Sequence, residues 1–215
     1  KCCHDLDILN WLTEGRAVRV YSQARRTHLT PRPAEQRHRR FEAGVVRQAA
    51  LDYGDSPLRR AFRAIADDSL YDADSDSPDH QTVLIEYDNG ILSTFTVCLA
   101  QPHNSRRVRI YGANGALEGD IDRSLIAVDK PNDDGGASVR REFAITGGEG
   151  GHHGADAVIN EAFWRGALGE PGTIRAGIRE GIEAVLIGLA AEESKRTGLP
   201  VDVSKLRAEV FGAES

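Results

Sequence analysis

The most informative stretch of the sequence is TVLIEYDNGILSTFTVCL, residues 82–99. On both sides of Asp88-Asn89-Gly90, apolar and polar residues alternate with a period of two, which is typical of half-buried strands. Asn and Gly readily adopt positive φ, so this tripeptide indicates a tight turn between strands at 82–87 and 91–99. The pattern therefore predicts an antiparallel hairpin near the middle of the chain.

Working outward from the hairpin, short periodic segments continue in both directions. Further strands are expected at 17–22, 107–111, 116–121, 124–128, 139–145 and 201–203, and helices at 2–13, 155–168 and 175–195. A helix, then strands, then helices, without alternation of the βαβ type, indicates the α+β class. We expect one broad, mostly antiparallel open sheet backed by helices.

Residues 27–80 are the least regular part of the sequence. Two short helices are expected there, at 45–51 and 58–65, followed by an acidic loop at 67–79. At the other end, 204–215 reads as a C-terminal tail with a frayed helix. We therefore predict that residues 1–203 form one domain.

Composition excludes several classes of protein. The 33 Asp and Glu residues outnumber the 27 Lys and Arg residues, and the net charge of −6 is spread along the chain, unlike the basic surface of a nucleic-acid-binding protein. No apolar run approaches the roughly 18–20 residues of a membrane-spanning helix. Three Cys, two of them adjacent, do not form a disulfide framework, so we expect a reducing, cytoplasmic location.

The start of the sequence carries a prediction of its own. The 215 residues contain no Met, and the chain begins at Lys1 within a helical pattern. Because a translated chain begins with Met unless it is processed, we expect a preceding segment to be missing.

The first stretch that could carry chemistry is KCCHDLD, residues 1–7. On a helix, Lys1, His4 and Asp5 lie on neighbouring turns of one face and can form a charge-assisted cluster. An imidazole can pass a proton in either direction, which suits general acid–base catalysis. The simpler interpretation, which the pattern alone favours, is a polar helix N-terminus with a capped first turn.

The second stretch is Asp79-His80-Gln81, at the start of the hairpin. The preceding Asp72-x-Asp74-x-Asp76 has the spacing of a calcium-binding loop, but Ser77 and Val83 stand where that loop requires Gly and Glu. An acidic solvated loop explains the spacing better. His80 is either a ligand-binding side chain or a satisfied residue at a strand end.

The third stretch is Gly150-Gly151-His152-His153-Gly154-Ala155-Asp156. Glycines let the backbone approach a ligand closely, and the helix N-terminus that follows can bind an anion or a hydroxyl. Asp156 can equally cap the helix or offset its dipole. His152, His153 and Asp156 could hold zinc, but their spacing is a weak metal signature, and we expect no metal.

Common catalytic motifs are missing from the sequence. Gly112-Ala113-Asn114-Gly115 follows a strand, but another strand comes next, so it is a hairpin turn and not a dinucleotide-binding loop. There is also no GxSxG, P-loop or CxxC motif. The residues alone predict an α+β domain with a His-lined cleft.

Taken in order, several stretches resemble the C-terminal domain of the Gfo/Idh/MocA oxidoreductase family. They are KCCHDLDILNWL (1–12), VRVYS (18–22), DSDSPDHQTVLIEYDNGILSTFTV (74–97), RRVRIYGANGALEGD (106–120), GGHHGAD (150–156) and GLPVDV (198–203). The resemblance covers nearly the whole chain. Within the family, the chain is most similar to members that carry KCCHD and DHQ and are often assigned to sugar or cyclitol substrates.

This resemblance implies that one domain binds the nucleotide and a second domain binds the substrate. In the family, an N-terminal Rossmann domain binds NAD or NADP and carries a catalytic Lys, and the substrate lies between it and the C-terminal domain. His4 matches the acid–base residue, and we expect Lys1, Asp5, His80, His152 and Asp156 to bind substrate. We also expect a homo-oligomer through the open sheet face.

Two departures from the family pattern stand out. Residues 31–70 lack the Cys that is often present in the most similar members, and Ala155 stands where Gly is more usual.

The leading hypothesis from the resemblance is the substrate-binding part of an NAD(P)-dependent sugar or cyclitol dehydrogenase, inactive without its nucleotide-binding domain. The alternatives are a non-catalytic, sheet-mediated binding or assembly module, an NAD-dependent glycoside hydrolase, and a metal-dependent hydrolase.

Overall fold

The computed structural model describes residues 3–33, 57, 71, 76–101, 105–132, 136–145, 154–172 and 176–212. The two short helices expected at 45–51 and 58–65 lie outside these residues. The chain divides into two compact units, the first formed by Lys1–Ala100 with Pro171–Ser215 and the second by Gln101–Glu170.

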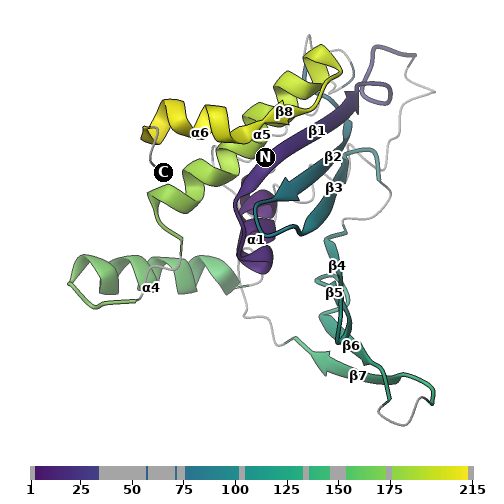
Figure 1. Cartoon of the computed structure of the whole chain (residues 1–215), viewed down its shortest axis with the longest axis vertical. Coiled ribbons are helices and arrows are strands. Elements are labelled where there is room, and N and C mark those ends of the chain that lie inside the picture. Colours follow the sequence, from purple (N-terminus) through teal and green to yellow (C-terminus); the bar gives the residue numbers. More distant parts are fainter. Residues whose placement is uncertain are drawn as a thin grey trace. The chain divides into compact units, whose positions relative to one another are not determined.

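Most of the expected elements are present, with longer bounds for several of them (Figure 1). In the first unit they are α1 (Cys3–Thr13), β1 (Ala17–Arg25), β2 (His80–Tyr87), β3 (Leu92–Cys98), α5 (Ile178–Thr197), β8 (Val201–Asp202) and α6 (Val203–Phe211). In the second they are β4 (Arg107–Gly112), β5 (Gly115–Asp120), β6 (Leu125–Lys130), β7 (Val139–Ala144) and α4 (Ala155–Ala167).

The sheet of the first unit has the strand order β3-β2-β1-β8, and all its pairings are antiparallel. The hairpin predicted at 88–90 is confirmed, with Gly90 at φ 81°. The Asn89 side chain closes the turn by accepting a hydrogen bond from the Ile91 amide, and it donates one to the Thr13 carbonyl at 2.8 Å. The same asparagine therefore shapes the hairpin and ties it to the end of α1.

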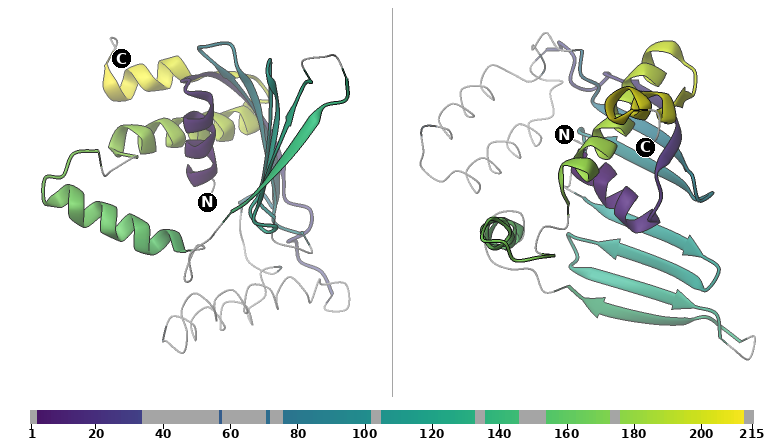
Figure 2. Two further views of the ribbon diagram at one scale, coloured as in Figure 1. Left: turned by 90° about the horizontal axis from the view of Figure 1, so that it is seen from below. Right: turned by 60° about the vertical axis from the view of Figure 1, so that its left-hand side comes forward.

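One face of this sheet is covered by helices. The left view of Figure 2 shows α1, α5 and α6 on the same side of β1, β2 and β3. Val20 and Ile85 of the sheet and Ile187 of α5 are almost fully buried between these layers. Helix α5 also contacts the sheet through polar groups, because the Ser22 amide of β1 donates a hydrogen bond to Ser194 Oγ of α5 at 2.9 Å. Because α1 packs in this layer of helices against the sheet, its position is fixed.

The C-terminal segment differs from the expected frayed tail. Residues 203–211 form α6, which is capped by the Asp202 side chain and buries Val203 and Arg207. The Arg207 guanidinium donates to both carboxylate oxygens of Glu183 at 2.8 Å and to the Ala17 carbonyl at 2.8 Å. Side-chain pairing with α5 therefore holds this segment in the fold.

The second unit contains a four-stranded meander, β4-β5-β6-β7, which is again antiparallel. The turn expected at 112–115 is confirmed. Gly115 has φ 141°, and a Cβ at this position would lie 2.2 Å from the Asp129 carbonyl oxygen. Glycine is therefore required where the hairpin turn meets β6.

The fold class predicted from the sequence is confirmed as α+β with antiparallel strand pairing. The strands are divided between two four-stranded sheets, where a single broad sheet was expected. Residues 99–106 follow β3 and precede β4, and the residues described there pair with no strand of either sheet. The alternation within each segment predicted the strands, but it does not say which strands share a sheet.

Candidate functional site

The helix that carries His4 packs against α5 on one side. Leu6 of α1 is 4% exposed and packs in the core cluster with α5. Thr13 Oγ1 donates to the Leu9 carbonyl at 2.9 Å in the last turn. A Cβ at Gly15 would lie 2.9 Å from Asn89 Nδ2, so a larger residue there would require the Asn89 side chain to move.

The outer side of α1 presents a mixed polar and apolar surface. His4 is exposed, and Ile8 and Trp11 follow it at the helical spacing i+4 and i+7, with exposed fractions of 40% and 70%. We call these three residues the His4 face. A large exposed aromatic beside an accessible imidazole is suited to contact with another molecule or domain.

A second cluster lies where β2 begins and β1 ends. Asp79 is 1% exposed, and its Oδ2 atom accepts hydrogen bonds from the amides of Thr27, His28 and Leu29 at 2.9, 2.6 and 2.8 Å. Its Oδ1 atom lies 2.7 Å from Nδ1 of His80. Burial alone raises the pKa of the Asp79 carboxyl, but the hydrogen bonds from Leu29, His80, His28 and Thr27 lower it to about 2. Asp79 is therefore an ionised carboxylate that organises a turn.

His28 completes this cluster and was not predicted from the sequence. Its Nδ1 atom lies 3.8 Å from Asp79 Oδ1, and its ring meets the His80 ring edge to face with centroids 5.9 Å apart. The two histidines are 52 positions apart, and no spacing rule links a histidine in a loop to one at a distant strand end. The pairing of Arg25 with His80 and the hydrogen bond from the His28 amide to the Asp79 carboxylate bring them together.

The predicted site residues fall in different places. Asp5 is half-buried on α1, and Asp156 is exposed in the first turn of α4 in the second unit. Lys1 and His152 lie outside the described residues. His80 shares its strand face with the exposed Thr82, opposite the face of β2 that α5 covers. The structure thus groups His80 with Asp79 and His28, and the joint action of the other residues stays a prediction.

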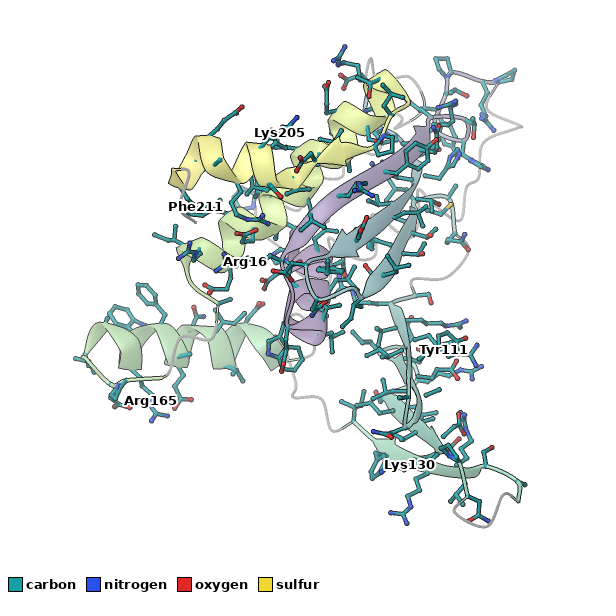
Figure 3. All side chains as sticks on the ribbon, in the orientation of Figure 1. Arg16, Tyr111, Lys130, Arg165, Lys205 and Phe211 are labelled. Atoms are coloured by element: carbon teal, nitrogen blue, oxygen red, sulfur yellow. The ribbon has the colours of Figure 1, made fainter. Side chains whose placement is uncertain are left out.

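The second sheet carries a small depression of about 50 Å³. Arg140 lines it and pairs with Asp129 at 2.9 Å, Glu142 at 3.1 Å and Glu118 at 3.8 Å. Pockets for small molecules usually have about 300–1,000 Å³. This depression is therefore too small for a sugar, and its charges are satisfied internally. On the same strand face, Arg109 lies over the ring of Tyr111, which is labelled in Figure 3.

Comparison with protein families identifies the class of the chain. The model of the GFO/IDH/MocA C-terminal domain matches residues 1–118, so the chain belongs to this family. The resemblance noted in the sequence is thereby confirmed. A comparison with curated protein sequences finds no match.

Solved structures share the fold. Levoglucosan dehydrogenase in complex with NADH is 17% identical, with a TM-score of 0.64 over 94% of this chain and 48% of that chain. An oxidoreductase domain protein from Kribbella flavida is also 17% identical, with a TM-score of 0.59 over 94% and 48%. The super-repressor mutant of Gal80p from Saccharomyces cerevisiae is 13% identical, with a TM-score of 0.58 over 95% and 48%.

The chain therefore spans about half the length of these structural relatives. All strand pairings among the described residues are antiparallel. The described part of the chain thus holds no parallel βαβ unit of the type that binds dinucleotides. No helix in the described ranges combines the length and the apolar character needed to cross a membrane.

Proposed function

We propose that this chain is the substrate-binding part of an NAD(P)-dependent oxidoreductase that acts on a hydroxyl group of a sugar or cyclitol. The observation that carries the proposal is His4, an accessible imidazole on a helix whose opposite side is fixed in the core. Membership of the GFO/IDH/MocA C-terminal domain family supports the reaction class. The fold of levoglucosan dehydrogenase, which was solved with NADH and levoglucosan, supports a sugar as substrate.

The chemistry assigned to His4 is proton transfer. Oxidation of a carbinol breaks a C–H and an O–H bond and forms a C=O bond, so a hydride and a proton must leave the substrate. A bound nicotinamide supplies the hydride acceptor. His4 takes the hydroxyl proton in oxidation and returns it in reduction, which contributes roughly 10²–10⁴-fold to the rate. Lys1, Asp5, His152 and Asp156 orient the remaining hydroxyls.

The His4 face also supports the proposal that a domain outside this chain packs against α1. Trp11 is 70% exposed and Ile8 is 40% exposed, although both belong to a helix that packs well through its other side. Burial of large apolar side chains is favourable by about 1.5–3 kcal/mol each. We assign this apolar surface to contact with the nucleotide-binding domain, which would bring NAD or NADP close to His4.

The experiment separates the two halves of the proposed enzyme. The 215-residue chain alone is expected to give no NADH fluorescence enhancement and no dehydrogenase turnover. The protein extended by the coding sequence upstream of Lys1 is expected to do both. NADH binding at micromolar affinity by the 215-residue chain would contradict the proposal, because the cofactor site would then lie within it.

A non-catalytic regulatory or assembly module is the second candidate. The super-repressor mutant of Gal80p among the structural relatives favours it, since the fold also occurs in a repressor. Calorimetry with sugars distinguishes this module from the dehydrogenase: sugar binding that His152→Ala abolishes supports a substrate cleft.

The products distinguish a dehydrogenase from an NAD-dependent glycoside hydrolase. The hydrolase would cleave a glycoside, whereas a dehydrogenase would only oxidise it.

The outer face of the first sheet supports a homo-oligomer. Leu84 and Leu92 on this face are 50% and 76% exposed, and they lie among the exposed threonines Thr82, Thr94 and Thr96. An antiparallel sheet that is covered on one side can use its other side for isologous pairing. Light scattering of Leu84→Asp, compared with the wild-type protein, tests this assignment.

A further inference from the structure

The cluster of His28, Asp79 and His80 has the donor set of a metal site. Each residue offers one ligand atom, and these atoms all lie within 4.8 Å of one another. Two imidazoles with one carboxylate suit zinc and other transition-metal dications. The cluster does not include His4, and its residue His80 lies on the face of β2 opposite the one that α5 covers.

The carboxylate is already oriented for such a role. Three backbone amides hold Oδ2 of Asp79, so Oδ1 is directed at the two imidazoles. Hydrogen bonds of this kind, from groups that do not contact the ion themselves, fix the orientation of metal ligands. The turn is held from its other side as well, because Arg32 donates to the Thr27 carbonyl at 2.8 Å. The backbone on both sides of His28 is therefore held by hydrogen bonds.

The distances allow an ion to enter with small side-chain rotations. The Nδ1 atoms of His80 and His28 lie 2.7 and 3.8 Å from Asp79 Oδ1. Tetrahedral zinc with bonds of 2.0–2.2 Å separates its ligand atoms by roughly 3.3–3.5 Å, which lies between these values. The side chains of His28 and His80 are 47% and 38% exposed, so an ion can reach the site from solvent.

We propose that His28, Asp79 and His80 bind one transition-metal dication of the zinc type at the start of β2. Three protein ligands leave one position of a tetrahedral ion to water, so the affinity is expected to be lower than that of a four-ligand structural site. The ion joins the loop after β1 to the start of β2. Its binding should therefore raise the thermal stability of the folded chain.

The test is calorimetric titration of the 215-residue chain with ZnCl₂ near pH 7.5, after tag removal and treatment with a chelator. Because other histidines can also bind zinc, the readout is the difference between variants. His28→Ala should weaken the site at least tenfold, and His28→Ala/His80→Ala should remove one equivalent. His4→Ala, which changes an exposed histidine elsewhere in the same unit, should leave this equivalent in place.

A thermal melt adds a second readout that does not depend on stoichiometry. At the same zinc concentration, zinc should raise the melting temperature of the wild-type protein and of His4→Ala more than that of His28→Ala. The single variant is suitable even if the double variant folds poorly, because the His28 side chain is nearly half exposed. Equal zinc binding and equal stabilisation in wild type and His28→Ala would overturn the proposal.

Discussion

At the residue scale, Asp79 connects a loop to a strand through a single buried carboxylate. Its Oδ2 atom accepts three backbone hydrogen bonds, and Oδ1 meets His80. The sequence placed Asp79 in an acidic loop, because its neighbours Asp72, Asp74 and Asp76 look alike in a composition profile. Of the two aspartates described there, Asp76 is exposed and Asp79 is buried and hydrogen-bonded, a difference that the composition of the loop does not predict.

The low pKa of Asp79 predicts acid sensitivity. Because its folded-state pKa of about 2 lies below the ordinary value of 3.8, its contribution to stability is complete above about pH 4 and is lost as the pH falls toward 2. The difference corresponds to about 2 kcal/mol. Denaturant unfolding of wild type and Asp79→Asn from pH 7 to pH 2 should show this loss in the wild type alone.

The exposed Asp76 provides the control for this experiment. Asp76→Asn should follow the wild-type curve across the whole pH range. If Asp79→Asn also followed it, the carboxylate would not be the group that organises the turn.

A second prediction at this scale concerns the turn between β4 and β5. Gly115→Ala should lower the free energy of unfolding by about 2 kcal/mol or more, because its φ of 141° disfavours alanine and the new Cβ would meet the Asp129 carbonyl. Gly112→Ala is the matched control, since its Cβ would have only an ordinary contact at 3.8 Å. Equal effects in thermal unfolding would mean that the turn is not under this constraint.

At the scale of elements, local patterns predicted most helices and strands, and long-range contacts explain what was missed. The hairpin at 82–99 was predictable because its turn and its alternation lie in one short stretch. Residues 204–215 were expected to form a tail with a frayed helix, and a nine-residue helix such as α6 has little stability of its own. What holds it is Arg207, which pairs with Glu183 at a distance of 24 positions in the sequence.

The buried pair between α5 and α6 predicts a large effect of mutation. The side chains of Arg207 and Glu183 are only 5% and 12% exposed, so Arg207→Ala leaves a carboxylate without its partner and should cost about 3–5 kcal/mol. Arg196→Ala removes an exposed ion pair with Glu193 and should cost less than about 1 kcal/mol. Chemical denaturation measures both, and similar losses would contradict a structural role for α6.

At the scale of the whole molecule, the chain contains two antiparallel units and spans about half of its structural relatives. The family was predictable because its motifs recur in order over nearly the entire sequence. The division into two sheets was not, since strand alternation carries no information about which strands are neighbours. Likewise, the sequence did not predict that His80 lies near His28 and Asp79, because the long-range pairing of β1 with β2 brings them together.

The central claim is that His4 exchanges the proton of the substrate hydroxyl. The most direct measurement is the steady-state kinetics of His4→Ala in the protein extended upstream of Lys1, with a sugar that the wild type oxidises. We predict that His4→Ala reduces kcat by about 10²–10⁴-fold and leaves KM nearly unchanged. The control is Cys3→Ser, which changes the exposed neighbour of His4 in α1 and should keep kcat near the wild-type value. A His4→Ala enzyme whose kcat remains close to that of the wild type would contradict the account.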